Sequence, residues 1–152
     1  IDKNYKTIAD KSQRAITGLS MGGHGALFLA LRHPDVFGAT GSISGGVDLK
    51  ESKNRFEISR RIGDTLLQAG NWQKFSVINI IENHTNSGLK IWIDCGDRDI
   101  FIDGNRRLHK KMQDLKIPHT YIERPGIHNW DYWSNAIPFQ LLFFQRFFLS
   151  GH

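Results

Sequence analysis

A serine between two glycines is the first feature of this sequence that could do chemistry. The run Gly18-Leu19-Ser20-Met21-Gly22 follows an apolar stretch and precedes a helical pattern. In the pattern Gly-x-Ser-x-Gly the serine occupies a strained turn, and the flanking glycines remove Cβ atoms that would collide there. The turn also aims the Met21 amide N–H at the position where an oxyanion would form. We predict Ser20 as the nucleophile of an acyl transfer and Met21 as an oxyanion donor.

A serine hydroxyl is a poor nucleophile unless an imidazole takes its proton and a carboxylate orients that imidazole. Asp99 follows the apolar run 89–95, and His128 follows the run 119–123. Both residues lie just past a predicted strand, as Ser20 does, and the carboxyl ends of parallel strands meet at one edge of a sheet. The strand-end positions therefore predict that Ser20, Asp99 and His128 come together.

Other residues compete for the roles of acid and base. Asp97 is the main rival of Asp99, whereas Asp94 falls inside a strand and would be awkwardly buried there. The competing histidines lie on predicted helices or open a strand: His24, His33, His109 and His119. With seven histidines in the chain, the order Ser, Asp, His is weak support by itself.

Alternating strands and helices must position these loops. We expect strands at residues 14–19, 39–43, 89–95 and 119–123, a helix from the serine turn to Pro34, a helix at 105–115, and a mostly helical tail at 130–149. The tail helix is expected to begin around Ser134, with Pro138 in its first turn. This alternation predicts an α/β fold whose mostly parallel sheet is covered by helices on both faces.

Residues 47–88 are harder to interpret. Ile58, Ile62 and Leu66 recur every four residues and predict one amphipathic helix ending near residues 69–70, with a second short helix after it. This segment forms either a pocket wall or a connection. We treat residues 1–152 as a single domain.

The first ten residues resemble the end of a helix. Tyr5 and Ile8 lie three residues apart and would provide core contacts from one face of that helix.

Composition limits the class of protein. The formal net charge of +5 is spread along the chain, which predicts a solvated basic surface and no nucleic-acid partner. The most apolar segment, 141–149, is interrupted by Gln145 and Arg146 and is too short to cross a bilayer, so we expect no membrane partner. Cys95 is the only cysteine, which excludes an intrachain disulfide and leaves a cytoplasmic, secreted or periplasmic location open.

These residues resemble the esterase D-like branch of the α/β-hydrolases, which includes S-formylglutathione hydrolases, tributyrin esterases, feruloyl and acetylxylan esterases, and mycolyltransferases. The resemblance rests on RAITGLSMGG (14–23) with 25–27, RHPDVF (32–37), 95–96 with Asp99, 105–106, and GIHNWDYW (126–133). It covers nearly the whole chain and is loosest over 47–88. It implies Ser20 as nucleophile, Asp99 as acid and His128 as base, which favours Asp99 over Asp97.

The resemblance implies a serine carboxylic-ester hydrolase that works through an acyl-enzyme without a metal or an organic cofactor. The expected substrates are short acyl esters, or acyl and feruloyl esters of carbohydrates. We expect Leu19 and Trp130 to line the substrate pocket. An acyltransferase of the same family, and an inactive fragment or binding scaffold, stay open as alternatives.

The start of the chain departs from the family pattern. Family members carry several strands before the nucleophile, and these N-terminal strands are missing here, so we expect the C-terminal part of an α/β-hydrolase fold. The loop that supplies the second oxyanion donor would be missing as well. The strand at 14–19 would then present an unpaired edge, and we expect self-association with another copy through that edge.

Overall fold

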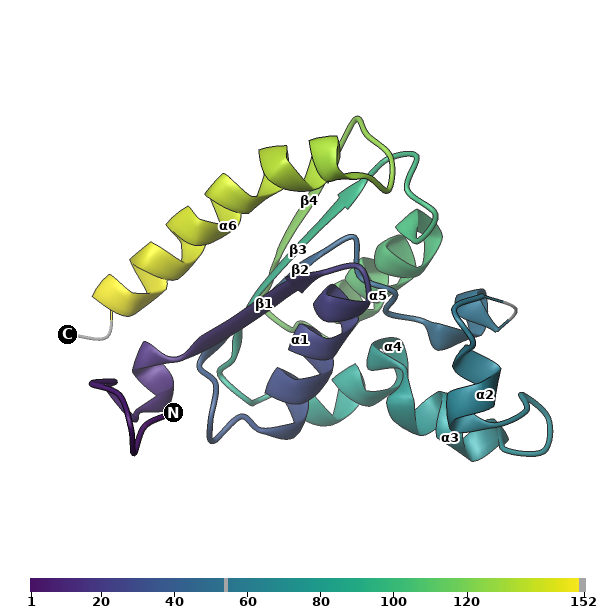
Figure 1. The fold of residues 1–152 in the computed structure, drawn as a ribbon, viewed down its shortest axis with the longest axis horizontal. Helices are drawn as coiled ribbons and strands as arrows, with labels where there is room; N and C mark the ends of the chain where they lie inside the picture. Colours follow the sequence, from purple (N-terminus) through teal and green to yellow (C-terminus); the bar gives the residue numbers. More distant parts are fainter. Residues whose placement is uncertain (54, 151–152) are drawn as a thin grey trace.

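The computed structural model describes residues 1–53 and 55–150. A four-stranded sheet lies at its centre, and all neighbouring strands are parallel (Figure 1). The strands, in chain order and in order across the sheet, are β1 (Ala15–Leu19), β2 (Ala39–Ile43), β3 (Lys90–Gly96) and β4 (Thr120–Arg124). Their carboxyl ends therefore meet at one edge of the sheet, as predicted.

Helices cover both faces of this sheet (Figure 1). On one face lie α1 (Met21–Arg32), α4 (Val77–Ile80) and α5 (Ile102–Asp114), and on the other lies α6 (Trp130–Leu149). The main core joins α1, α4 and α5 to the sheet through buried side chains that include Leu27, Leu31, Val77, Ile91, Ile93, Leu108 and Met112. The predicted α/β fold with two covered faces is confirmed.

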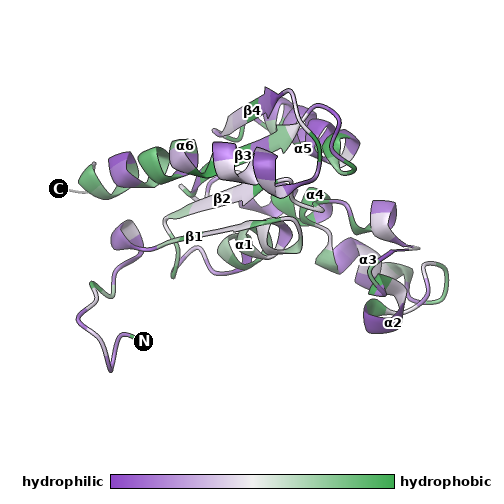
Figure 2. Cartoon of the chain, turned by 45° about the horizontal axis from the view of Figure 1, so that its top comes forward, coloured by the Kyte–Doolittle hydropathy of each residue, from purple (hydrophilic) through white to green (hydrophobic). Residues whose placement is uncertain are grey.

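A smaller core lies between α6 and the sheet. Tyr132 and Ala136 of α6 pack against Ile43 of β2, with Leu19 of β1 beside them. Figure 2 shows hydrophobic residues along α6 up to its C-terminal end. In the described part of the chain, no helix has both the length and the apolar character that crossing a bilayer requires.

The α6 helix begins earlier than predicted. It starts at Trp130 because the Asn129 side chain accepts a hydrogen bond from the Tyr132 amide N–H at 3.0 Å and caps the helix there. Pro138 consequently lies in the helix interior and not in the first turn.

The single helix predicted from Ile58 is wrong. The chain forms α2 (Ile58–Ile62), turns, and then forms α3 (Ala69–Phe75). Gly63, with φ of 92°, ends α2, and the Asp64 carboxylate accepts the amide N–H groups of the two leucines that follow it. Leu66, expected on the buried face, is 86% exposed. Two 3₁₀ turns, η2 (Leu49–Ser52) and η3 (Ile81–His84), flank this region.

The helix predicted in the first ten residues is also wrong. Residues 1–10 form turns and irregular backbone, followed by the 3₁₀ turn η1 (Lys11–Gln13). Tyr5 and Ile8 are 69% and 63% exposed, so neither joins the core.

Candidate active site

Ser20 occupies the sharp turn between β1 and α1. Its backbone has φ of 54° and ψ of −120°, a conformation that serine rarely adopts and that active sites hold under strain. A Cβ on Gly18 would lie 2.4 Å from the backbone of Gly22, so the turn requires glycine at position 18. A Cβ on Gly22 would meet no atom within 4 Å, which corrects the prediction that both flanking glycines relieve a collision.

The structure brings the three predicted residues into one hydrogen-bonded chain. Ser20 Oγ lies 2.9 Å from His128 Nε2, and His128 Nδ1 lies 2.9 Å from each carboxylate oxygen of Asp99. Because a carboxylate only accepts, Nδ1 carries the proton in this arrangement and Nε2 faces the serine hydroxyl as an acceptor. This orientation is the one that allows an imidazole to remove the serine proton.

Buried surroundings fix the Asp99 carboxylate. Asp99 is 3% exposed and its Oδ1 also accepts the Phe101 amide N–H at 2.9 Å. The His128 ring makes edge contacts with two aromatic rings, Phe101 at 5.3 Å and Trp133 at 4.9 Å between centroids. The imidazole is therefore held by packing on two sides as well as by its hydrogen bonds.

The rival acids occupy other positions. Asp97 Oδ1 accepts the Gly126 amide N–H at 2.9 Å and so supports the loop that carries His128 without contacting the imidazole. Asp94 is fully buried, as expected, and its carboxylate pairs with Arg124 and accepts the Tyr132 hydroxyl.

The rival histidines are also engaged elsewhere. His24 Nδ1 lies 3.0 Å from the Gly46 carbonyl oxygen, and burial lowers the pKa of His24. His109 Nδ1 lies 2.8 Å from His119 Nε2, at a contact between α5 and the chain entering β4. His33 is the C-terminal cap of α1.

The Met21 amide lies at the start of α1, immediately after Ser20. First-turn N–H groups of a helix have no acceptor within the helix, and the helix dipole favours negative charge at this end. The placement fits the oxyanion donor that the sequence predicts.

Two small cavities lie near the serine turn. The first, of about 180 Å³, lies between β1 and α6 and is lined mainly by apolar side chains that include Leu19, Ile43, Trp130, Trp133 and Ile137, but not by Ser20. The structure thus places Leu19 and Trp130 in one cavity. The second, of about 200 Å³, is lined by Ser20, Met21, Gly46, Ser52, Phe56 and Phe101.

Sequence reasoning missed the aromatic side chains of the second cavity. Phe56 and Phe101 lie 6.2 Å apart between ring centroids. Phe101 had a detectable signal, because it is a large apolar residue just past Asp99 at a strand end. Phe56 had none, since it belongs to the irregular segment, where its φ is 56°.

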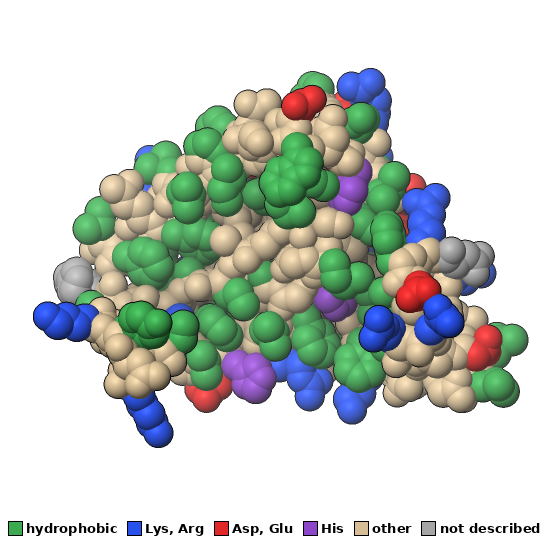
Figure 3. All heavy atoms as spheres, viewed as in Figure 1, with side chains coloured by type: hydrophobic (Ala, Val, Ile, Leu, Met, Phe, Trp, Pro, Cys, Tyr) green, Lys and Arg blue, Asp and Glu red, His purple; other side chains and the backbone are tan. Residues whose placement is uncertain are grey.

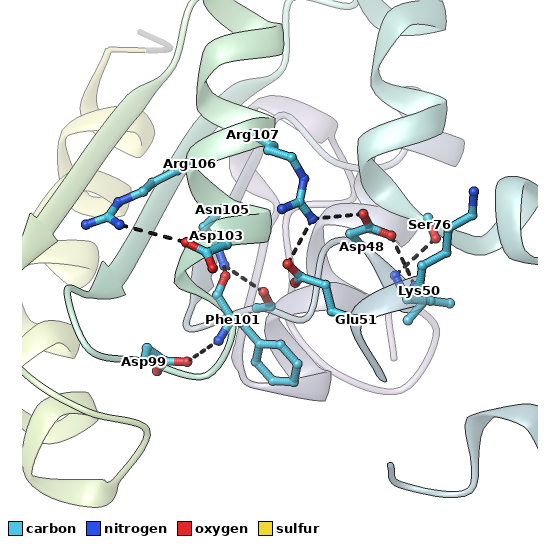
Figure 4. A network of polar contacts seen from close by, with 12 residues as sticks. Asp48, Lys50, Glu51, Ser76, Asp99, Phe101, Asp103, Asn105, Arg106 and Arg107 are labelled. Atoms are coloured by element: carbon cyan, nitrogen blue, oxygen red, sulfur yellow. Dashed lines mark hydrogen bonds and ion pairs between the residues drawn. The ribbon is translucent and has the colours of Figure 1, made fainter. Parts of the chain in front are cut away.

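A polar network attaches this irregular segment to α5. Arg107 donates to Asp48 at 3.0 Å and to Glu51 at 2.8 Å, as Figure 4 shows. The buried Asn105 amide donates to the Gly45 carbonyl oxygen at 2.9 Å and to that of Phe101 at 2.8 Å. The helix that follows Asp99 thereby also positions the far wall of the second cavity.

Within residues 1–53 and 55–150, no three His, Cys, Asp or Glu side chains gather as a group that could hold a metal ion.

The parallel sheet, the serine turn and the order Ser, Asp, His at three strand ends define the α/β-hydrolase class. Residues 1–144 match the model of the Esterase family, described as "Putative esterase". The chain belongs to this family, as its resemblance to the esterase D-like branch predicts.

Individual relatives agree with this assignment. A solved ferulic acid esterase superposes with a TM-score of 0.82 at 31% identity, covering 97% of this chain and 57% of its own. An acetyl esterase of Caldicellulosiruptor saccharolyticus is 28% identical over 134 residues, which is 80% of this chain and 50% of the relative. An endo-1,4-beta-xylanase/feruloyl esterase of Xylanibacter ruminicola is 51% identical over 51 residues, 34% of this chain and 7% of that protein. The chain spans half or less of the length of these two curated relatives.

Proposed function

We propose that this chain is the triad-bearing part of a serine carboxylic-ester hydrolase that works through an acyl-enzyme. The observation that carries the proposal is the continuous contact from Ser20 Oγ through the His128 ring to Asp99, each link 2.9 Å long. The strained backbone at Ser20 and the adjacent helix start provide further support.

In the first half-reaction, Ser20 Oγ attacks the ester carbonyl carbon while His128 Nε2 takes the hydroxyl proton. Asp99 stabilises the resulting imidazolium through Nδ1–H, and the Met21 amide N–H donates to the oxyanion. The imidazolium then gives its proton to the leaving alkoxide oxygen, which departs as an alcohol and leaves the acyl-enzyme. In the second half-reaction a water molecule attacks the acyl carbon while His128 Nε2 takes a proton from it. The bond between the acyl carbon and Ser20 Oγ then breaks, His128 returns the proton to Oγ, and the carboxylic acid leaves.

The substrates we propose are short acyl esters, or acyl and feruloyl esters of carbohydrates. The cavity that Ser20 lines would accept a small group, and it offers the aromatic rings of Phe56 and Phe101 to a planar acyl group. The names of the relatives, an acetyl esterase and a ferulic acid esterase, are consistent with both substrate classes.

Two alternatives share this geometry. An acyltransferase would use a sugar hydroxyl in place of water in the second half-reaction. A scaffold without turnover would keep the contacts of the triad but would not hydrolyse an ester.

Intact-mass labelling with a fluorophosphonate tests the proposal. We expect one adduct on the unmodified chain and none on Ser20→Ala or His128→Ala. Hydrolysis of p-nitrophenyl acetate and of methyl ferulate is then measured. A hydrolase cleaves at least one of these esters, whereas a scaffold reacts with the fluorophosphonate but hydrolyses neither. A chain that is folded by circular dichroism but forms no adduct contradicts the proposal for this polypeptide.

We also propose that the chain self-associates through β1. This strand pairs with β2 on one side, and among the described residues no strand lies on its other side. Figure 3 shows hydrophobic side chains over the face on which β1 and α6 lie. A paired second copy would satisfy the free backbone groups of the edge. Light scattering that shows a monodisperse monomer contradicts this proposal.

A further inference from the structure

A buried carboxylate ties together three elements beside the triad. Asp94 of β3 is fully buried; one of its oxygens accepts the Tyr132 hydroxyl at 2.5 Å, and the other pairs with the Arg124 guanidinium. Burial raises the pKa of Asp94, because the charged form loses hydration. Burying a carboxylate is costly unless it is fully paired, so this cluster depends on both partners being in place.

The two partners of Asp94 stand at the two ends of the loop that carries His128. Arg124 is the last residue of β4, and Tyr132 lies in the first turn of α6. The loop between these elements is visible in Figure 1. The strand that carries Asp94 also leads into the turn that carries Asp99. The Asp94 carboxylate therefore anchors both ends of the loop that carries His128 to β3, the strand that precedes Asp99.

The first part of the loop packs against the Tyr132 ring. A Cβ on Gly126 would lie 2.2 Å from Tyr132 Cδ2, so the backbone and the ring are in close contact. On its other side Gly126 meets Gly96, where a Cβ would lie 2.6 Å from the Gly126 carbonyl oxygen. The amide N–H of Arg98 donates to that same oxygen at 3.0 Å. Gly126 is thus held between the Tyr132 ring on one side and the Gly96 backbone on the other.

We propose that Tyr132, held by its hydrogen bond to Asp94, is a positioning residue for His128. It acts through the loop and touches neither substrate nor the reacting atoms. The proposal rests on the proposed function for its effect on rate, because proton transfer requires His128 to keep both of its 2.9 Å contacts. A misplacement of about 1 Å at a reacting group can cost about 100-fold in rate.

Tyr132→Phe removes the hydroxyl and keeps the ring volume. We expect fluorophosphonate labelling of Ser20 to slow by about 10- to 100-fold. The matched control is Tyr121→Phe, since the Tyr121 hydroxyl donates to Glu123 at 3.1 Å on β4, away from the loop. The control should label at the rate of the unmodified chain. Asp94→Asn should slow labelling as well, and combining it with Tyr132→Phe should add little if both act through one hydrogen bond.

A second readout does not depend on activity. The Nδ1 proton of His128, hydrogen-bonded to Asp99, should give a proton resonance downfield of the amide region. We expect this resonance to shift or broaden in Tyr132→Phe and to persist in Tyr121→Phe, with circular dichroism showing both variants folded. If the unmodified chain does not label but the resonance responds in this way, the proposed function fails and the positioning role stands. An unchanged resonance and an unchanged labelling rate in folded Tyr132→Phe overturn the positioning role.

Discussion

The two sides of the Ser20 site are held by different kinds of contact. On the His128 side, Asp94 and Tyr132 are buried, and the partly buried Gly126 packs directly on neighbouring backbone. On the side of Phe56, the wall formed by Gly46, Ser52 and Phe56 is joined to α5 by the buried Asn105 and also by the ion pairs of Arg107, whose side chain is 49% exposed (Figure 4). Close-packed buried groups tolerate little displacement. An exposed ion pair contributes only about 0–1 kcal/mol to stability, so it constrains the position of its partners weakly. From this comparison we predict that the geometry of Ser20, Asp99 and His128 is more rigid than the wall beside Phe56.

The largest effect we predict is at Asp99. In Asp99→Asn the amide group can donate toward His128 Nδ1 and favour the wrong tautomer, so labelling of Ser20 should slow by about 10⁴-fold, the loss seen for this change in a Ser-His-Asp protease. The matched variant Asp97→Asn keeps an oxygen that can accept the Gly126 amide N–H and should label far faster than Asp99→Asn. The labelling rate is measured by intact mass against time. If Asp97→Asn slows labelling as much as Asp99→Asn does, Asp97 would again be a candidate for the triad acid.

A second prediction concerns packing beneath Ser20. A Cβ on Gly23 would lie 2.7 Å from Ser42 Oγ and 3.1 Å from two backbone oxygens. Gly23→Ala should therefore force α1 away from β2 and lower the free energy of unfolding by about 1–3 kcal/mol. Gly25→Ala, where the added Cβ meets no atom within 4 Å, should raise it by about 0.5–1 kcal/mol. Thermal unfolding followed by circular dichroism distinguishes the two; a Gly23→Ala variant as stable as Gly25→Ala would show that this interface is not tightly packed.

The sequence predicts the His128 side of the site far better than the side of Phe56. Ser20, Asp99 and His128 each follow a buried strand, and the apolar runs that mark such strands are strong local signals. The segment that contains the wall residues Ser52 and Phe56 and continues into α2 and α3 is different. There α2 has five residues and α3 has seven, too few for a helical period to be recognised. Gly63 and Asp64 form the break between them, and the buried Trp72 indole N–H donates to the Gly63 carbonyl oxygen across it.

The Asp94 cluster shows a related limit. A carboxylate inside an apolar strand signals a buried polar contact, and the sequence does indicate that Asp94 is buried. Its partners, Arg124 and Tyr132, lie 30 and 38 residues further along the chain, and only the register of β3 with β4 and the start of α6 bring them to it.

The third prediction tests the wall beside Phe56. Arg107→Gln removes both ion pairs to η2 and its cap, and we expect KM for an aryl ester to rise by less than about fivefold while kcat stays within about twofold. Arg106→Gln is the control, because Arg106 pairs with Glu123 on β4 and leaves the wall untouched. A large fall in kcat in Arg107→Gln would show that the wall also positions the catalytic groups and would end the distinction between the two sides.

The smallest effect we predict is a pH dependence at the same wall. Burial raises the pKa of Glu51 above its ordinary value of 4.5, although Arg107 opposes the shift. The folded chain therefore holds this proton more tightly than the unfolded chain, and the free energy of unfolding should fall as pH rises from about 4.5 to the raised pKa, then level off. Glu51→Gln cannot ionise, so its urea-unfolding free energy should lack this decrease when the two proteins are compared from pH 4 to 7. Parallel curves for the two proteins would mean that Glu51 is solvated in solution and that the wall is looser than the contacts of Arg107 indicate.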